Sequence, residues 1–195
     1  MREMPNNIEG FNHIEYLIVF NAVLFGVIAA EYFSGWGAML RYRRENKFYA
    51  LHFLWTLFAF FTFMQNWYGI WPRTKFINDN ILYFFYSLAP MFVYHLITVA
   101  LFPGTKNKKN IDYKLYYFSN SRLLFILFAL YFLLAISSSY VYEDLGNVLF
   151  QNLIRAAAAA LSLVAAYFYK KVWLHYIFVM IGFLGLIDFI LHIPT

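Results

Sequence analysis

Six long apolar runs, separated by short polar segments, constrain this chain more than any other feature of its sequence. About 20 consecutive apolar residues are enough to cross the hydrocarbon core of a bilayer as an α-helix. Charged residues make up only 13% of the 195-residue chain, about half the fraction typical of a soluble domain. The pattern therefore predicts an all-α polytopic membrane protein, a six-transmembrane-helix bundle that forms a single domain over residues 1–195, with spans at about 14–40, 48–71, 81–102, 123–142, 148–169 and 172–193.

The runs favour helices over the strands of an outer-membrane barrel. Such strands alternate in polarity over about ten residues, whereas these runs are longer and uniformly apolar. A helix also satisfies every backbone hydrogen-bonding group within its own segment, as lipid demands. The last two runs meet at Lys170 and Lys171, and we place a break there because a single helix would extend far past the bilayer.

Basic residues crowd alternate connections between the runs. Eleven of the fifteen Lys and Arg residues lie in residues 41–47, residues 103–122 and the pair Lys170–Lys171. Because short loops rich in Lys and Arg stay in the cytoplasm, both termini should lie outside, and we favour a bacterial inner membrane. These loops should contact anionic lipids, and no nucleic-acid partner is expected. Residues 111–118 could form a short helix at the headgroup boundary, and the favoured alternative is that the basic residues of this loop only contact anionic lipid.

The predicted topology places one set of buried polar residues in the cytoplasmic half of the membrane. This set consists of Glu31, His52, His95 and His175. At a rise of 1.5 Å per residue, Glu31 lies about 13 Å from the inner end of its span. A carboxylate and imidazoles at similar depth suit a proton relay or a cation site. The alternatives are a protonated Glu31 that donates to a backbone carbonyl, and histidines that only support the fold.

A second set of polar residues falls in the outer half. Arg155 and Asp188 would each cost roughly 2.5–3.5 kcal/mol at the centre of a lone helix, so we predict that they form a buried ion pair. That pair would either fix the helix register or serve an anion or proton site. The amides of the same half are predicted to form an outer polar cluster, which comprises Asn21, Gln65, Asn66, Gln151 and Asn152.

Small residues and one proline indicate how the helices pack. Residues 156–160 are five consecutive alanines, and Gly182 and Gly185 lie in the last run. Because small residues let membrane helices approach closely, we expect the fifth and sixth spans to pack tightly against each other. Pro90, near the middle of the third span, predicts a kink.

Several chemistries are disfavoured by the residues that the chain lacks. The sequence has no Cys, which removes disulfides, thiolate nucleophiles and thiolate zinc sites. It also has no nucleophile elbow and no glycine-rich phosphate loop. No two histidines are spaced as a metal pair on one helix, so no metal site or cofactor is predicted. Haem between His52 and His95, at comparable depth on consecutive spans, is the alternative that stays open.

Three stretches resemble a group of uncharacterised bacterial multi-span membrane proteins, over roughly the first two thirds of the chain. They are residues 31–36 (EYFSGW), residues 65–71 (QNWYGIW), and the set Asp112, Tyr116, Tyr117, Ser121 and Arg122. The resemblance implies a bacterial membrane protein and no particular activity.

These observations lead to one functional hypothesis and two alternatives. The hypothesis is an ion, proton or small-solute conduit that uses Glu31 and the inner histidines. The first alternative is an interaction or assembly subunit or sensor without transport, which would form a homo-oligomer or bind a membrane protein partner. The second is a haem- or metal-binding membrane enzyme, although an enzyme is the less favoured reading of the sequence.

Overall fold

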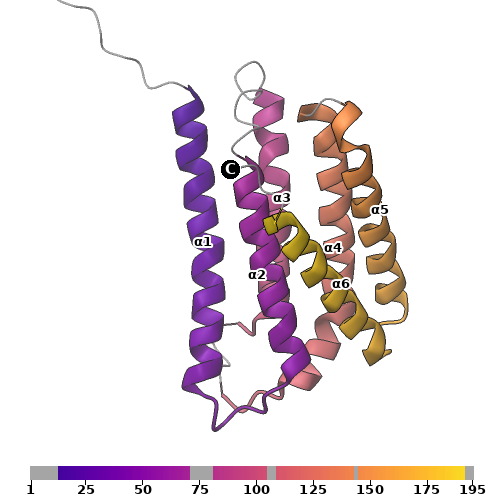
Figure 1. Cartoon of the computed structure of the whole chain (residues 1–195). Coiled ribbons are helices and arrows are strands. Elements are labelled where there is room, and N and C mark those ends of the chain that lie inside the picture. Colours follow the sequence, from indigo (N-terminus) through magenta and orange to yellow (C-terminus); the bar gives the residue numbers. More distant parts are fainter. Residues whose placement is uncertain (1–12, 71–80, 105–108, 143–144, 192–195) are drawn as a thin grey trace, which may run out of the picture.

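The computed structural model describes residues 13–70, 81–104, 109–142 and 145–191, with the backbone alone described for residues 13–17, 70, 81–85, 87, 141–142, 145–148 and 188–190. Over these ranges the chain forms six α-helices and no strand, which confirms the all-α prediction (Figure 1). The helices are α1 (His13–Arg41), α2 (Ala50–Ile70), α3 (Ile81–Leu101), α4 (Tyr113–Tyr142), α5 (Leu145–Tyr167) and α6 (Val172–Leu191).

Three helices are long and apolar enough to cross a membrane, as judged over the described residues. The candidate spans are Ile18–Arg41, Tyr113–Tyr140 and Leu149–Tyr167, and two shorter apolar stretches are Leu88–Leu101 and Val172–Ile187. The helices are therefore compatible with a membrane protein. The number of spans and the side on which the termini lie stay predictions.

The start of α4 differs most from the expected boundaries. We expected the fourth span to begin at residue 123, with residues 111–118 in the preceding loop or in a short interfacial helix, but α4 begins at Tyr113 and continues without a break. Asp112 explains this start because its side-chain Oδ1 accepts hydrogen bonds from the backbone N–H groups of Lys114 (3.1 Å) and Leu115 (3.2 Å). An Asp at this position satisfies backbone donors that have no partner within the helix.

The helices run alternately up and down, and α6 crosses the bundle obliquely (Figure 1). Contrary to our expectation, α5 packs chiefly along α4 and only lightly on α6. Gly182 of α6 faces α2 instead, where a Cβ atom would lie 2.3 Å from the ring of Phe58. The small residues permit close approach as predicted, but which helix each one meets depends on the tertiary arrangement. α3 continues through Pro90 as one helix.

Aromatic side chains form much of the buried core. Trp55 of α2 is fully buried, and its ring centroid lies 5.1 Å from those of Phe125 on α4 and Phe178 on α6. Between α1, α2 and α3, the buried rings are Tyr32, Phe63 and Tyr94. Each pair buries a large apolar area and adds roughly 0.5–1.5 kcal/mol beyond that burial.

Two basic loops are joined where α1, α2, α3 and α4 meet at one end of the bundle. Lys47 N donates to Ile111 O (2.8 Å) and Tyr113 N donates to Lys47 O (3.1 Å). Lys47 Nζ also lies 3.5 Å from Asp112 Oδ2, and Lys109 Nζ lies 3.6 Å from Glu45 Oε2. We call this arrangement the loop clasp, defined by residues 45–47 and 109–113. It holds the start of α2 against the start of α4.

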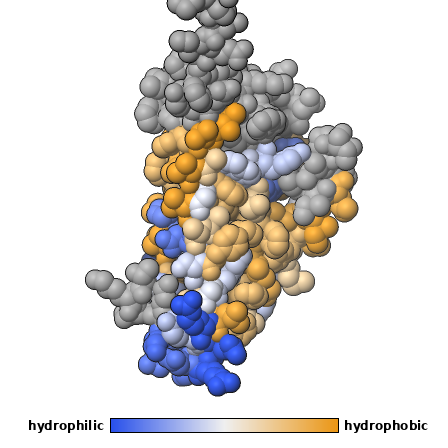
Figure 2. Space-filling view, turned by 90° about the vertical axis from the view of Figure 1, so that its left-hand side faces the viewer, coloured by the Kyte–Doolittle hydropathy of each residue, from blue (hydrophilic) through white to orange (hydrophobic). Residues whose placement is uncertain are grey.

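The outer surface is apolar along the helices and polar at the end that carries the loop clasp. Figure 2 shows hydrophilic residues gathered at that end, below a broadly hydrophobic flank. Large apolar side chains are exposed on several of the described helices, among them Val23, Val27 and Phe33 of α1, Leu153 and Ile154 of α5, and Ile181 of α6. Exposed apolar area on this scale marks a lipid or protein contact surface.

Candidate functional site

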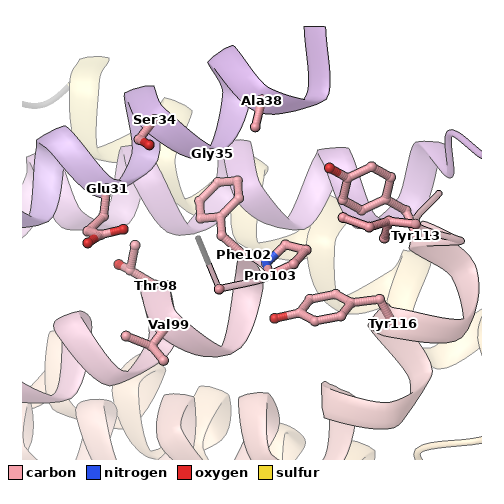
Figure 3. A pocket seen from close by; sticks show the side chains of 12 residues that line it. Glu31, Ser34, Gly35, Ala38, Thr98, Val99, Phe102, Pro103, Tyr113 and Tyr116 are labelled. Atoms are coloured by element: carbon pink, nitrogen blue, oxygen red, sulfur yellow. The ribbon is translucent and has the colours of Figure 1, made fainter. Parts of the chain in front are cut away.

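A cavity of about 230 Å³ opens between α1, α3 and the connection from α3 to α4. One face of α1 contributes Glu31, Ser34, Gly35 and Ala38, which recur at helical spacing. The opposite wall comes from the last turn of α3, and the floor comes from the start of α4 (Figure 3). The remaining lining residues are Thr98, Val99, Phe102, Pro103, Gly104, Ile111, Tyr113 and Tyr116.

Glu31 lies at the open side of this cavity and not inside the bundle. Its side chain is exposed, whereas Ile28 and Tyr32 of the same helix are buried. The sequence suggested a buried carboxylate because it reveals depth along a helix but not which face turns inward. In Figure 3 the side chains of Glu31 and Thr98 point toward each other across the gap between α1 and α3.

Close packing sets the distance between α1 and α3. A Cβ atom on Gly35 would lie 2.2 Å from the ring of Phe102. The Phe102 ring in turn packs edge-on against Tyr32, with centroids 5.6 Å apart. Glycine at position 35 therefore lets α1 approach α3 closely, so that Glu31 and α3 line the same cavity. Phe102 lies at the middle of that cavity (Figure 3).

His52 is buried directly behind the cavity floor. It is 1% exposed, and its ring stacks on that of Tyr113 at a centroid distance of 5.0 Å and an interplanar angle of 23°. Its Nε2–H donates to the carbonyl oxygen of Leu101 at 2.8 Å. That carbonyl ends α3 and has no partner within the helix. Because a carbonyl only accepts, the bond assigns a proton to Nε2.

His175 lies deeper in the same aromatic layer. It is 0% exposed, and its Nδ1 lies 2.6 Å from the hydroxyl of Tyr117. The ring of Tyr117 also meets that of His52, with centroids 6.1 Å apart. Thus three members of the predicted inner set relate differently to the cavity: Glu31 lines it, His52 supports its floor, and His175 is a further side chain away.

His95 does not line the cavity. It is half-buried on α3, one helical turn before Thr98 and Val99. His52 does not line the cavity either, and haem between these two histidines stays a prediction. Among the described residues, no three His, Asp or Glu side chains gather as a metal-binding group.

The outer polar residues form a network between α4 and α5. Arg155 Nη1 donates to Asn152 Oδ1 (3.0 Å), and Ser139 Oγ donates to the same oxygen (2.8 Å). Arg155 also lies 3.5 Å from both Ala135 O and Gln151 Oε1. The side chain of Asp188 falls outside the described residues, so the predicted Arg155–Asp188 pair stays a prediction.

The other predicted outer amides belong to a different part of the bundle. Asn21 of α1 is buried, and Gln65 and Asn66 of α2 are half-buried. Asn66 Nδ2 lies 4.0 Å from Met91 Sδ on α3. Only Gln151 and Asn152 of the predicted amide cluster therefore join Arg155 in described hydrogen bonds.

Sequence reasoning did not identify several of the residues that line the cavity. Gly35, Phe102, Tyr113 and Tyr116 were not singled out as site residues, although residues 31–36 and Tyr116 fell within the resemblance described above. Tyr113 and Tyr116 could have been found from their spacing, since Asp112 predicts a helix start and places both rings on its first turn. The Gly35–Phe102 contact has no signal in the sequence.

The chain matches no protein-family model, no curated protein and no solved structure. The resemblance to a group of bacterial membrane proteins therefore stays a prediction, and the site has to be interpreted from its own residues.

Proposed function

We propose that the chain is a multi-pass protein of a bacterial inner membrane, with six spans and both termini outside, that conducts protons or a small cationic solute. The cavity between α1 and α3 is the observation that carries this proposal. Its described lining includes one carboxylate, that of Glu31, and no Lys, Arg or His. A cavity with this charge attracts cations and disfavours anions.

The surroundings of the cavity support a role in conduction. Ionisable side chains within membrane helices are costly and most often mark ion or proton routes. The hydroxyls of Ser34, Thr98 and Tyr116 line the same space as Glu31 and can hydrogen-bond a hydrated cation or a chain of waters. The basic residues of the loop clasp lie at the end of the bundle that we assign to the cytoplasm, where anionic lipids would hold them.

Flux measurements on purified protein in liposomes test this proposal. The wild-type protein should carry protons or a small cationic solute, and Glu31→Gln should abolish that flux because it removes the only charge in the cavity lining described. Glu45→Gln is the matched control, since Glu45 pairs with Lys109 on the exposed loop and lies outside the cavity. It should leave the flux unchanged.

Two results would contradict conduction. One is the absence of any proton or cation flux from correctly inserted protein. The other is a flux that Glu31→Gln and Glu45→Gln alter equally. A stable protein partner that co-purifies without flux would instead favour the assembly-subunit alternative.

A further inference from the structure

The walls of the cavity discriminate between kinds of cation. Ca²⁺ takes six to eight oxygen ligands, usually several of them from carboxylates, whereas Glu31 is the only carboxylate among the described lining residues. The hydroxyl of Thr98 donates to Tyr94 O at 2.8 Å and keeps its lone pairs for a ligand. With a single carboxylate, the described lining favours a cation that needs fewer charged oxygen ligands.

Aromatic rings provide a second kind of contact for a cation in this cavity. Phe102, Tyr113 and Tyr116 line the cavity beyond Glu31, and Figure 3 shows the ring of Tyr116 extending from α4 toward Pro103. Ring faces attract organic ammonium groups, which are larger and less strongly hydrated than metal ions. A carboxylate at one end and aromatic rings at the other suit an ammonium group with a short carbon chain.

The size of the cavity agrees with a ligand of this kind. About 230 Å³ is more than one water-sized ligand needs, and it is smaller than the 300–1,000 Å³ or so of drug-sized pockets. A bare ion would leave most of this space unfilled, whereas a small amine with its carbon chain would fill it.

The position of the opening determines how such a ligand could enter. Glu31 is exposed and Val99 is 56% exposed, so the cavity opens on the apolar flank of the bundle. An ammonium group could reach it from the membrane as part of a lipid headgroup. It could also come from solution, past Gly104 at the end of α3.

We propose that the cavity between Glu31 and the rings of Phe102, Tyr113 and Tyr116 binds an organic ammonium group, carried either by a lipid headgroup or by a free amine. This inference rests on the proposed function, since it names the class of cation that the same site receives. The carboxylate of Glu31 pairs with the ammonium, and the rings contact its carbon substituents.

Calorimetric titration of the full-length protein in detergent tests the inference, with choline chloride as the probe and potassium chloride at equal ionic strength as the reference. Choline should bind and potassium should not. Glu31→Gln should weaken choline binding by about tenfold or more, because a charge-assisted contact is lost. Tyr116→Leu should weaken it about two- to fivefold, and Glu45→Gln should leave it unchanged.

A second arm distinguishes the two sources of the ammonium group. The protein is placed in nanodiscs of phosphatidylglycerol, with and without phosphatidylethanolamine, and choline is titrated into each. Weaker choline binding when phosphatidylethanolamine is present identifies the lipid headgroup as the natural occupant. Equal binding in both identifies a free amine.

Two outcomes overturn the inference: choline binding that is no stronger than that of potassium, and choline binding that Glu31→Gln leaves unchanged. Each can be told apart from failure of the proposed function. If choline binds in detergent but the protein shows no flux in liposomes, the proposed conduction is wrong and the ammonium site is retained. If proton flux depends on Glu31 but choline does not bind, the proposed conduction is retained and the ammonium site is wrong.

Discussion

Gly35 and Phe102 control how closely α1 approaches α3 beside the cavity. A side chain at position 35 would meet the Phe102 ring at 2.2 Å, a distance that no Cβ atom tolerates, and the ring is only 7% exposed. Nothing lies within 4 Å of the corresponding position on Gly37, two residues further along α1. Substitution by alanine is therefore expected to destabilise the protein at Gly35 but not at Gly37, which serves as the matched control.

Gly35→Ala should destabilise the protein by about 1–3 kcal/mol, as overpacked sites do. Gly37→Ala should be neutral or stabilising by up to about 1 kcal/mol, because alanine is the better helix former. Thermal unfolding of both variants in the same detergent measures the difference. Equal melting temperatures would show that α1 and α3 are not in close contact at Phe102.

His52 links the start of α2 to the end of α3. Replacing it by Phe keeps the ring that stacks on Tyr113 but removes the hydrogen-bond donor to Leu101 O. A buried carbonyl without its partner costs about 1–3 kcal/mol, so His52→Phe should lower the unfolding free energy by that amount. His52→Gln retains an N–H donor and should lose less. If both variants unfold alike, the Leu101 bond does not contribute.

At the scale of the elements, Asp112 decides where α4 begins. The backbone N–H groups of Leu115 and Lys114, together with the Lys47 ammonium, stabilise its carboxylate and hold the pKa of Asp112 below its usual value. The stability that this shift contributes is fully present above the usual Asp pKa of about 4. It is lost as the pH falls through the lower pKa of the folded protein.

Asp112→Ala should therefore lower the melting temperature at pH 7 more than Asp112→Asn, which retains an oxygen that accepts from the helix start. On acidification from pH 5 to pH 2, the wild-type protein should lose more stability than Asp112→Asn, which has no proton to gain at this position. Melting curves across that range provide the measurement. Parallel pH profiles for the two proteins would exclude this role for Asp112.

The boundaries of the elements show where sequence reasoning succeeds. Apolar length and flanking charge located α2, α3 and α6 to within a few residues. α4 was misjudged because Lys114 and Arg122 interrupt its apolar run. In the structure the helix simply turns these two side chains outward. Hydropathy detects the apolar part of a helix, whereas the capping group determines where the helix starts.

At the scale of the whole molecule, the basic loops predict one orientation in the membrane. The chain has no Cys, so a single introduced Cys reports its own side without background. Arg44→Cys, Lys109→Cys and Lys171→Cys should be protected from a membrane-impermeant maleimide in intact cells, because short basic loops stay in the cytoplasm. Arg2→Cys and Lys75→Cys should be labelled. The reverse pattern would show that the termini face the cytoplasm.

The sequence by itself determined the helical class, most helix boundaries and the gathering of basic residues at one end. These properties follow from local free energies, since each apolar residue favours lipid and each helix satisfies its own backbone. Only the tertiary structure decided which faces meet: that α5 packs along α4, that Gly35 meets Phe102, and that Glu31 lines a cavity while His52 lies behind its floor. Such contacts depend on how side chains from distant helices fit together, which no single segment encodes.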